Sequence, residues 1–195
     1  MRKLKLQVQM TVDGYIAGPN GEMDWMTLNW DAELNQYVTE ITAPVDCIVL
    51  GRKLAQGFIP HWAAHPEEDG AEKINNTLKV VFTKTLEKSE WANTVLAKGN
   101  LVDEIMQLKK QAGSDIIAYG GAGFVSSLIQ NGLVDEYHLL VNPAAIGTGM
   151  PIFKELKCTQ KLILKASRAF ACGIVLLCYE PQAAVLAPNY TPALQ

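Results

Sequence analysis

The chain has 195 residues, of which 49% are hydrophobic and 19% charged, a composition that fits one globular domain and excludes an extended disordered chain. With 17 Lys and Arg against 20 Asp and Glu, the formal net charge is −3, so we expect neither nucleic acid nor an anionic membrane as a partner. No apolar run approaches the roughly 20 residues needed to cross a bilayer, and the N-terminus has no signal-peptide core.

The N-terminal part of the chain predicts a strand, a long loop and a helix. Apolar and polar residues alternate over 4–12, which indicates a strand with one face more buried than the other. The glycines and the proline of 13–26 predict a connecting loop. Asp31 is the expected N-cap of a helix whose apolar residues share one stripe and which ends before Pro44.

The rest of the chain alternates short apolar runs with helical patterns. Strands are expected at 46–50, 78–83, 93–97, 115–119 and 135–141, and the runs 160–170 and 172–180 are expected to form a hairpin. Helices are expected at 51–58, 100–113 and 121–132, with a loop at 59–70.

This alternation predicts an α/β domain with a central, mostly parallel sheet and an antiparallel edge. No linker or internal repeat divides the sequence, so we expect a single domain over 1–180. The proline-containing segment 181–195 is expected to be a tail, loosely ordered or packed on a neighbour.

The pair Gly120-Gly121 stands between an expected strand and an expected helix. Glycine is costly there in conformational entropy, so the turn either needs a backbone that only glycine adopts or must admit a close neighbour. A turn without side chains lets a phosphate approach the amides of a helix N-terminus, whereas the alternative is a tight turn with nothing bound. A GxGxxG fingerprint would need glycine at Ser126, and no P-loop is present.

Two further strand ends carry groups suited to phosphate. Gly51 is followed by Arg52 and Lys53 at the start of a helix, and the strand in VVFTK (79–84) ends in a hydroxyl and a cation, Thr83 and Lys84. A solvated Arg-Lys pair explains Arg52 and Lys53 without a ligand. The three strand ends together favour a phosphate-bearing ligand.

Groups for proton transfer, metal ligation and thiol chemistry are few. Asp13 lies where the first strand meets its glycine-rich loop. His61 and His65 flank Trp62 in an expected loop, and none of the three histidines has a partner at metal-ligand spacing, so we predict no metal. The four cysteines show no CxxC spacing, which favours reduced thiols in a cytoplasmic protein.

These motifs resemble the reductase family that includes the C-terminal domain of the bacterial bifunctional riboflavin-biosynthesis protein, within the dihydrofolate-reductase-like fold. The similar segments are MTVDGYIAGPNGEMDW, DCIVLGRK, VVFTKTL and IAYGGAGFVSSLIQNGLVDEYHLLVNPAAIGTGMPIF, which lie in order between positions 10 and 153. The resemblance implies a three-layer fold with helices on both faces of the sheet, a homodimer, and NADPH as cofactor. Because residue 1 already lies near the first expected strand, we expect the deaminase domain of the bifunctional protein to be absent here.

The resemblance assigns roles to individual residues. Gly120, Gly121, Ala122 and Gly123 would form the pyrophosphate turn, which answers why the glycines are there. Gly51, Arg52 and Lys53 would meet the cofactor phosphates, and Thr83 with Lys84 the adenosine 2′-phosphate. In folds of this kind the bond between Gly120 and Gly121 can be cis, and we predict a cis peptide there. The family commonly has a threonine where this chain has Leu54.

The same resemblance implies a reductase acting on a small molecule like the ribosylamino-pyrimidine phosphate of riboflavin synthesis. The loop 13–25 would cover the nicotinamide, Asp13 or a water would supply the proton, and the substrate wall would comprise Trp25, Trp30, His61 and Trp62. Core packing is an alternative for each tryptophan. Two other functions stay open: a folate or pterin reductase, for which no clear carboxylate lies deep in the first helix, and a nucleotide-binding protein without turnover. A structural module without ligand is the fourth possibility.

Overall fold

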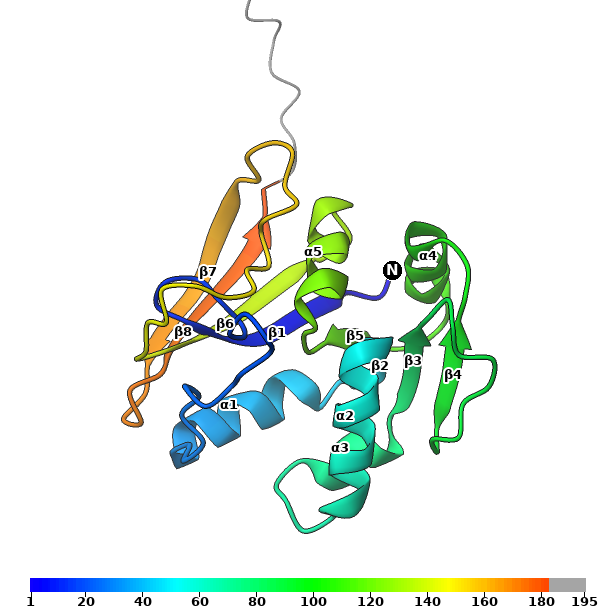
Figure 1. The fold of residues 1–195 in the computed structure, drawn as a ribbon, viewed down its shortest axis with the longest axis horizontal. Helices are drawn as coiled ribbons and strands as arrows, with labels where there is room; N and C mark the ends of the chain where they lie inside the picture. The colour runs from blue at the N-terminus through cyan, green and yellow to red at the C-terminus, as the bar shows by residue number, and fades with distance from the viewer. Residues whose placement is uncertain (183–195) are drawn as a thin grey trace, which may run out of the picture.

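The computed structural model describes residues 1–182, and within this range eight strands form one sheet in the order β4-β3-β2-β5-β1-β6-β8-β7 (Figure 1). The strands are β1 (Leu4–Thr11), β2 (Val45–Gly51), β3 (Leu78–Phe82), β4 (Thr94–Ala97), β5 (Asp115–Ala118), β6 (Glu136–Asn142), β7 (Leu162–Ala169) and β8 (Val175–Pro181). Strands β1 to β6 pair in parallel, whereas β8 runs antiparallel to both of its neighbours, β6 and β7. The predicted mostly parallel sheet with an antiparallel C-terminal hairpin is confirmed.

Five helices of the described chain cover the two faces of this sheet. They are α1 (Ala32–Thr42), α2 (Arg52–Ala64), α3 (Ala71–Asn76), α4 (Leu101–Lys110) and α5 (Ala122–Gln130). Helices α4 and α5 pack on one face, and α1, α2 and α3 pack on the other (Figure 1). The helices on both faces complete the three layers that the sequence predicted.

The core divides according to the alternation of side chains along the strands. In β5, Ile116 and Ala118 point to the α4–α5 face, whereas Ile117 points to the α2–α3 face. A third, smaller apolar cluster joins Leu34 of α1 to Leu140 of β6. Strands buried on both faces read as unbroken apolar runs, which is why these elements could be found in the sequence.

Helix α1 begins as predicted, whereas the segment after β2 differs from the prediction. The Asp31 carboxylate accepts a hydrogen bond from Leu34 N (2.9 Å), which confirms Asp31 as the N-cap. The loop expected at 59–70 is wrong, because α2 continues to Ala64 with Pro60 inside it. Helix α3, which the sequence did not predict, follows within the same connection.

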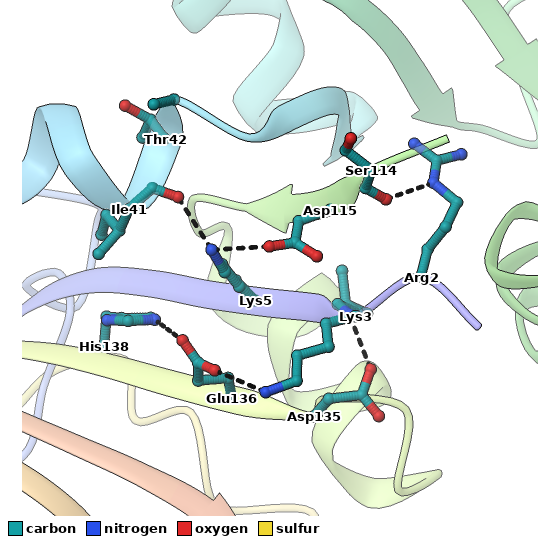
Figure 2. A network of polar contacts seen from close by, with 12 residues as sticks. Arg2, Lys3, Lys5, Ile41, Thr42, Ser114, Asp115, Asp135, Glu136 and His138 are labelled. Atoms are coloured by element: carbon teal, nitrogen blue, oxygen red, sulfur yellow. Dashed lines mark hydrogen bonds and ion pairs between the residues drawn. The ribbon is translucent and has the colours of Figure 1, made fainter. Parts of the chain in front are cut away.

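A network of charged and polar groups lies between α1 and the amino half of β1 (Figure 2). Lys5 Nζ binds the Asp115 carboxylate (2.8 Å) and Ile41 O (3.1 Å), which ties the last turn of α1 to the sheet. On β6, Glu136 accepts from the His138 ring (2.6 Å) and from Lys3 Nζ (3.2 Å). The hydrogen bond from His138 lowers the pKa of Glu136 to about 2, so this carboxylate stays ionised and paired at neutral pH.

No helix in residues 1–182 is long and apolar enough to cross a membrane. The tail predicted at 181–195 lies outside the described residues, except for its first two residues. Pro181 is the last residue of β8, and the amide of Gln182 donates to Lys161 O (2.9 Å). Of the four cysteines, all free, Cys47 and Cys178 are buried, Cys172 is half-buried and Cys158 is exposed.

Candidate active site

The carboxyl ends of the parallel strands lie at one edge of the sheet, where the direction of winding reverses between β5 and β1. From β1 the chain passes through α1 to β2 on one side of this pair, and from β5 it passes through α5 to β6 on the other. In open α/β sheets, a reversal of this kind opens a crevice beyond the strand ends that binds ligands. The sheet order therefore places a candidate site next to the turn from β5 to α5.

Gly120 and Gly121 form that turn with φ angles of 144° and 78°, in the region that favours glycine. Gly121 is also the N-cap of α5, and no side chain caps this helix. The predicted cis peptide is wrong, since none occurs in residues 1–182. Positive φ at both glycines turns the chain with trans peptide bonds, so the pair is explained by the backbone angles.

Gly51 lets the start of α2 approach the start of α5. A Cβ atom added at Gly51 would lie 2.8 Å from Cβ of Phe124 in the first turn of α5, closer than real Cβ atoms come. The ring of Phe124 also packs, tilted, against Phe82 at the end of β3, with ring centroids 5.2 Å apart. The ends of β2 and β3 and the start of α5 therefore meet around one side chain, which brings the expected strand ends together.

Two helix N-termini consequently lie side by side without side-chain caps. Both α2 and α5 follow a glycine, and neither has an acidic residue in its first turn. Their first amides lack intrahelical partners, so both ends attract anions. Arg52 is half-buried and its Nη1 donates to Gln56 Oε1 (3.1 Å), while Lys53 is exposed.

Thr83 and Lys84 follow β3 at the neighbouring position, where Phe82 pairs with Gly51 of β2. Thr83 is buried, and its hydroxyl oxygen accepts from the amides of Thr85 (3.1 Å) and Leu86 (3.0 Å). The Thr83 side chain thus shapes the turn, and Lys84, which is exposed, is the group free to reach a ligand.

Asp13 connects the loop after β1 to the loop after β6. Its carboxylate accepts hydrogen bonds from the amides of Ile146 (3.1 Å) and Gly147 (2.7 Å). A hydrogen bond from Thr11 and these backbone amides lower the pKa of Asp13. A carboxyl group held ionised is a poor proton donor at neutral pH, so the geometry favours a role in positioning the two loops.

The same two loops interlock further along. Ile16 N donates to Met150 O (3.1 Å), and Met150 N donates to Ala17 O (2.8 Å). Beyond them, Thr27 N donates to the Asn142 side chain (2.8 Å) at the end of β6. The glycine-rich loop therefore lies over the carboxyl ends of β1 and β6, on the far side of β5 from α2.

Comparison with known families identifies the domain. A model of the RibD C-terminal domain family matches residues 2–176. The chain belongs to this family. The resemblance found in the sequence is thereby confirmed over nearly the whole described chain.

Two uncharacterized proteins match more of this chain than a RibD protein does. Protein YyaP of Bacillus subtilis (strain 168) is 32% identical, with 92% of this chain and 95% of YyaP covered. Protein YwjB of the same strain is 26% identical, with 90% and 96% covered. The riboflavin biosynthesis protein RibD of Corynebacterium ammoniagenes is 25% identical over 75% of this chain, but only 44% of that protein is covered.

Solved structures of similar proteins share the fold. A putative riboflavin biosynthesis protein from Shewanella sp. PV-4 superposes with a TM-score of 0.71 at 21% identity, covering 92% of this chain and 99% of the other. The deaminase/5-amino-6-(5-phosphoribosylamino)uracil reductase of Thermotoga maritima gives 0.69 at 17% identity, covering 93% and 57%. The RibD C-terminal fold is thus established for this chain.

The aromatic residues expected to form the substrate wall lie in three different places. Trp30 packs against the apolar cluster around Leu34 of α1 and Leu140 of β6, and its indole N–H donates to Thr27 O (3.0 Å). Trp25, in the loop, is half-buried, and its indole nitrogen has no hydrogen-bond partner within residues 1–182. Trp62 and His61 belong to the last turn of α2, roughly 14 Å along the helix from Arg52 at 1.5 Å per residue, so the structure does not bring them to the strand ends.

Two aromatic residues beside the glycine turn were missed. The ring of Tyr119, directly before Gly120, stacks on Phe58 of α2 with centroids 5.4 Å apart. Burial raises the pKa of Tyr119, so its hydroxyl stays protonated. Leu54 completes this side, since a Cβ atom added at Gly121 would meet the Leu54 side chain at 3.6 Å. The position of Tyr119 next to the double glycine was the signal that could have identified it.

A cavity of about 570 Å³ lies at the opposite edge of the sheet, lined by Met1, Arg2 and residues 109–115. Two of its three cationic side chains are engaged internally: Arg2 pairs with Asp46, and Lys109 pairs with Asp135 (2.5 Å), which leaves the exposed Lys110. The carboxyl edge, with two uncapped helix N-termini, remains the better candidate for an anionic ligand.

Proposed function

We propose that this chain is an NADPH-dependent reductase whose cofactor phosphates bind between the N-termini of α2 and α5. The observation that carries the proposal is the close approach of these two uncapped helix starts, which Gly51 permits against Phe124. Each helix start offers free amides and a positive dipole end to a phosphate. Two such ends beside one crevice suit a ligand with two linked phosphates.

The residues around the crevice fit such a dinucleotide. Gly120 to Gly123 present backbone without bulky side chains, and Gly123 has open space where a Cβ atom would stand. Arg52 and Lys53 add positive charge at the start of α2, and Lys84 is the group we assign to the 2′-phosphate. Thr83 supports Lys84 by fixing the turn through its two accepted hydrogen bonds.

When bound, NADPH supplies a hydride from its nicotinamide ring. The chain has to hold that ring against the substrate and keep water away. We assign these tasks to the loop 13–25, which lies over the ends of β1 and β6 and is fixed there by Asp13. The buried indole N–H of Trp25 lacks a partner in the described chain, and a hydrogen bond to a bound molecule would satisfy it.

For the substrate we propose a small heterocyclic or ribosyl compound similar to 5-amino-6-(5-phosphoribosylamino)uracil, named for the Thermotoga maritima neighbour. Dihydrofolate or a pterin is the second class. A nucleotide-binding protein without turnover is favoured by one observation, the lowered pKa of Asp13, since no ready proton donor then stands among the residues proposed for catalysis.

Titration of the purified protein with NADPH and NADH, followed by nicotinamide fluorescence, tests cofactor binding. Consumption of NADPH is then measured against pyrimidine, pterin and carbonyl substrates. Saturable NADPH binding with turnover of one substrate class supports the reductase, and binding without turnover supports a nucleotide-binding protein that does not catalyse a reaction. The absence of NADPH binding would refute the proposal.

A further inference from the structure

The last turn of α2 and the turn after it bring together His61, His65 and Glu68. One ligand atom of each of these side chains lies within 4.8 Å of those of the other two. His61 Nε2 and Glu68 Oε2 are 3.1 Å apart, and the two imidazole rings have centroids 4.5 Å apart. The prediction that no histidine has a partner at ligand spacing is wrong here, because it treated this segment as a loop. On a helix, residues four apart share a face.

We propose that His61, His65 and Glu68 form a binding site for a divalent transition-metal ion such as Zn²⁺, Ni²⁺ or Co²⁺. Two imidazoles and one carboxylate are a common ligand set for such ions. Ligand atoms at bond lengths of about 2.1 Å in a tetrahedral site stand roughly 3.4 Å apart, so side-chain movements of about 1 Å would close this cluster on an ion.

The backbone fixes the relative positions of the three ligands. His65 N donates to His61 O (3.1 Å), and Glu68 N donates to His65 O (3.2 Å). The His65 ring also binds His61 O through Nδ1 (2.8 Å). A carbonyl can only accept, so Nδ1 carries the proton and the lone pair on Nε2 is left for a metal ion. Metal-ligating histidines are oriented by a hydrogen bond of this kind.

The surroundings favour a cation and leave room for water ligands. The side chains of His61 and Glu68 are 48% and 41% exposed, so an ion can enter directly and keep open coordination positions. The negative end of the α2 dipole lies at this turn. The exposed carboxylates Glu67 and Asp69 flank Glu68 in sequence and add negative charge.

A second group of ligand-type residues, Glu136, His138 and Cys178, is a weaker candidate. Both ring nitrogens of His138 already have partners: Nε2 lies 2.6 Å from Glu136, and Nδ1 lies 2.5 Å from Tyr37 Oη. His138 and Cys178 are buried, so this cluster is satisfied by hydrogen bonds and closed to direct entry. The solvent-facing cluster on α2 has neither restriction.

The test is calorimetric titration of reduced protein, freed of metal by chelation, with ZnCl₂, NiCl₂ and CoCl₂. One ion should bind per chain and raise the melting temperature. His61→Gln and His65→Gln should each lower the affinity at least about tenfold, and Glu68→Gln should lower it less. Glu72→Gln, an exposed carboxylate on α3, is the matched control and should bind as the wild type does. Circular dichroism checks that each variant is folded.

The Co²⁺ complex separates the two clusters. Ligation by nitrogen and oxygen alone gives visible d–d bands without sulfur-to-metal charge transfer. Absence of saturable binding would overturn the proposal. So would binding that survives in the double variant His61→Gln/His65→Gln, or a charge-transfer band that disappears in Cys178→Ser.

Discussion

The replacement Gly51→Ala tests whether the starts of α2 and α5 depend on their close approach. The added Cβ atom would lie 2.8 Å from Cβ of Phe124, and ordinary contacts begin at 3.4 Å, so the two helix starts must separate by about 0.6 Å. Because Cβ of Phe124 is fixed to the α5 backbone, no flexible side-chain end can move away instead. Overpacking of this kind costs about 1–3 kcal/mol.

Gly57→Ala, in the same helix, is the matched control. Nothing lies within 4 Å of a Cβ atom added at Gly57, and the residue is exposed. Alanine is the better helix former, so this change should stabilise the fold by about 0.5–1 kcal/mol. The two variants carry the same chemical change and are expected to shift stability in opposite directions.

Urea unfolding measures both free energies, and fluorescence titration measures NADPH affinity. Gly51→Ala should also weaken NADPH binding, on the order of tenfold, because the two phosphate-binding helix ends are displaced. Gly57→Ala should leave that affinity unchanged. A Gly51→Ala variant as stable as Gly57→Ala would refute the packing of α2 against α5, and normal NADPH affinity in a destabilised variant would refute the binding role.

Three further predictions concern charge and assembly. Glu136→Gln should lower the free energy of unfolding at neutral pH by on the order of 2 kcal/mol. The wild type loses this stability as pH falls from about 4.5 towards 2, because the pKa of Glu136 is lower in the folded state than in the unfolded state. Unfolding followed by circular dichroism over this pH range should therefore show a flatter dependence of stability on pH in the variant. Lys84→Ala should weaken NADPH binding by about 1–3 kcal/mol and leave NADH binding nearly unchanged, as measured by parallel titrations, and an unaltered preference for NADPH would contradict the assignment of the 2′-phosphate. The edge strand β7 is the expected interface of a homodimer, because its Ile163 and Leu164 side chains are 48% and 52% exposed. Leu164→Lys should then yield monomers in light scattering. A dimer that persists in this variant would place the interface elsewhere.

The fold could be predicted because its central strands are buried on both faces. Runs such as 46–50 and 115–119 carry no polar break after their first residue, and amphipathic helical patterns lie between such runs. Asp31 was identified as an N-cap because its side chain interacts within one turn, over a sequence distance of three residues. Local signals of this kind are contained in the sequence itself.

The segment after β2 was misread because local signals conflict there. Pro60, together with the run from Pro66 to Gly70, is typical of a loop, yet α2 continues past Pro60 to Ala64. Buried Ile59 and half-buried Trp62 pack the helix against the α2–α3 face of the sheet, and this tertiary packing outweighs the propensity of proline. The error concealed the four-residue spacing of the two histidines.

Only some residues of the candidate site could be predicted from the sequence. The double glycine and the cations after the strands are visible in the sequence. The contact of Gly51 with Phe124 joins residues far apart in the chain, and the use of the Thr83 hydroxyl by its own turn depends on backbone geometry. Such contacts follow from the assembled sheet and cannot be deduced from spacing.

Hydrogen–deuterium exchange with and without NADPH tests the central claim most directly. The account predicts that NADPH slows exchange in two peptides together, one covering residues 51–54 and one covering 119–124. The opposite edge of the sheet, around Arg2 and residues 109–115, should be unaffected. Protection at that opposite edge alone, or in neither of the two helix starts, would contradict the account.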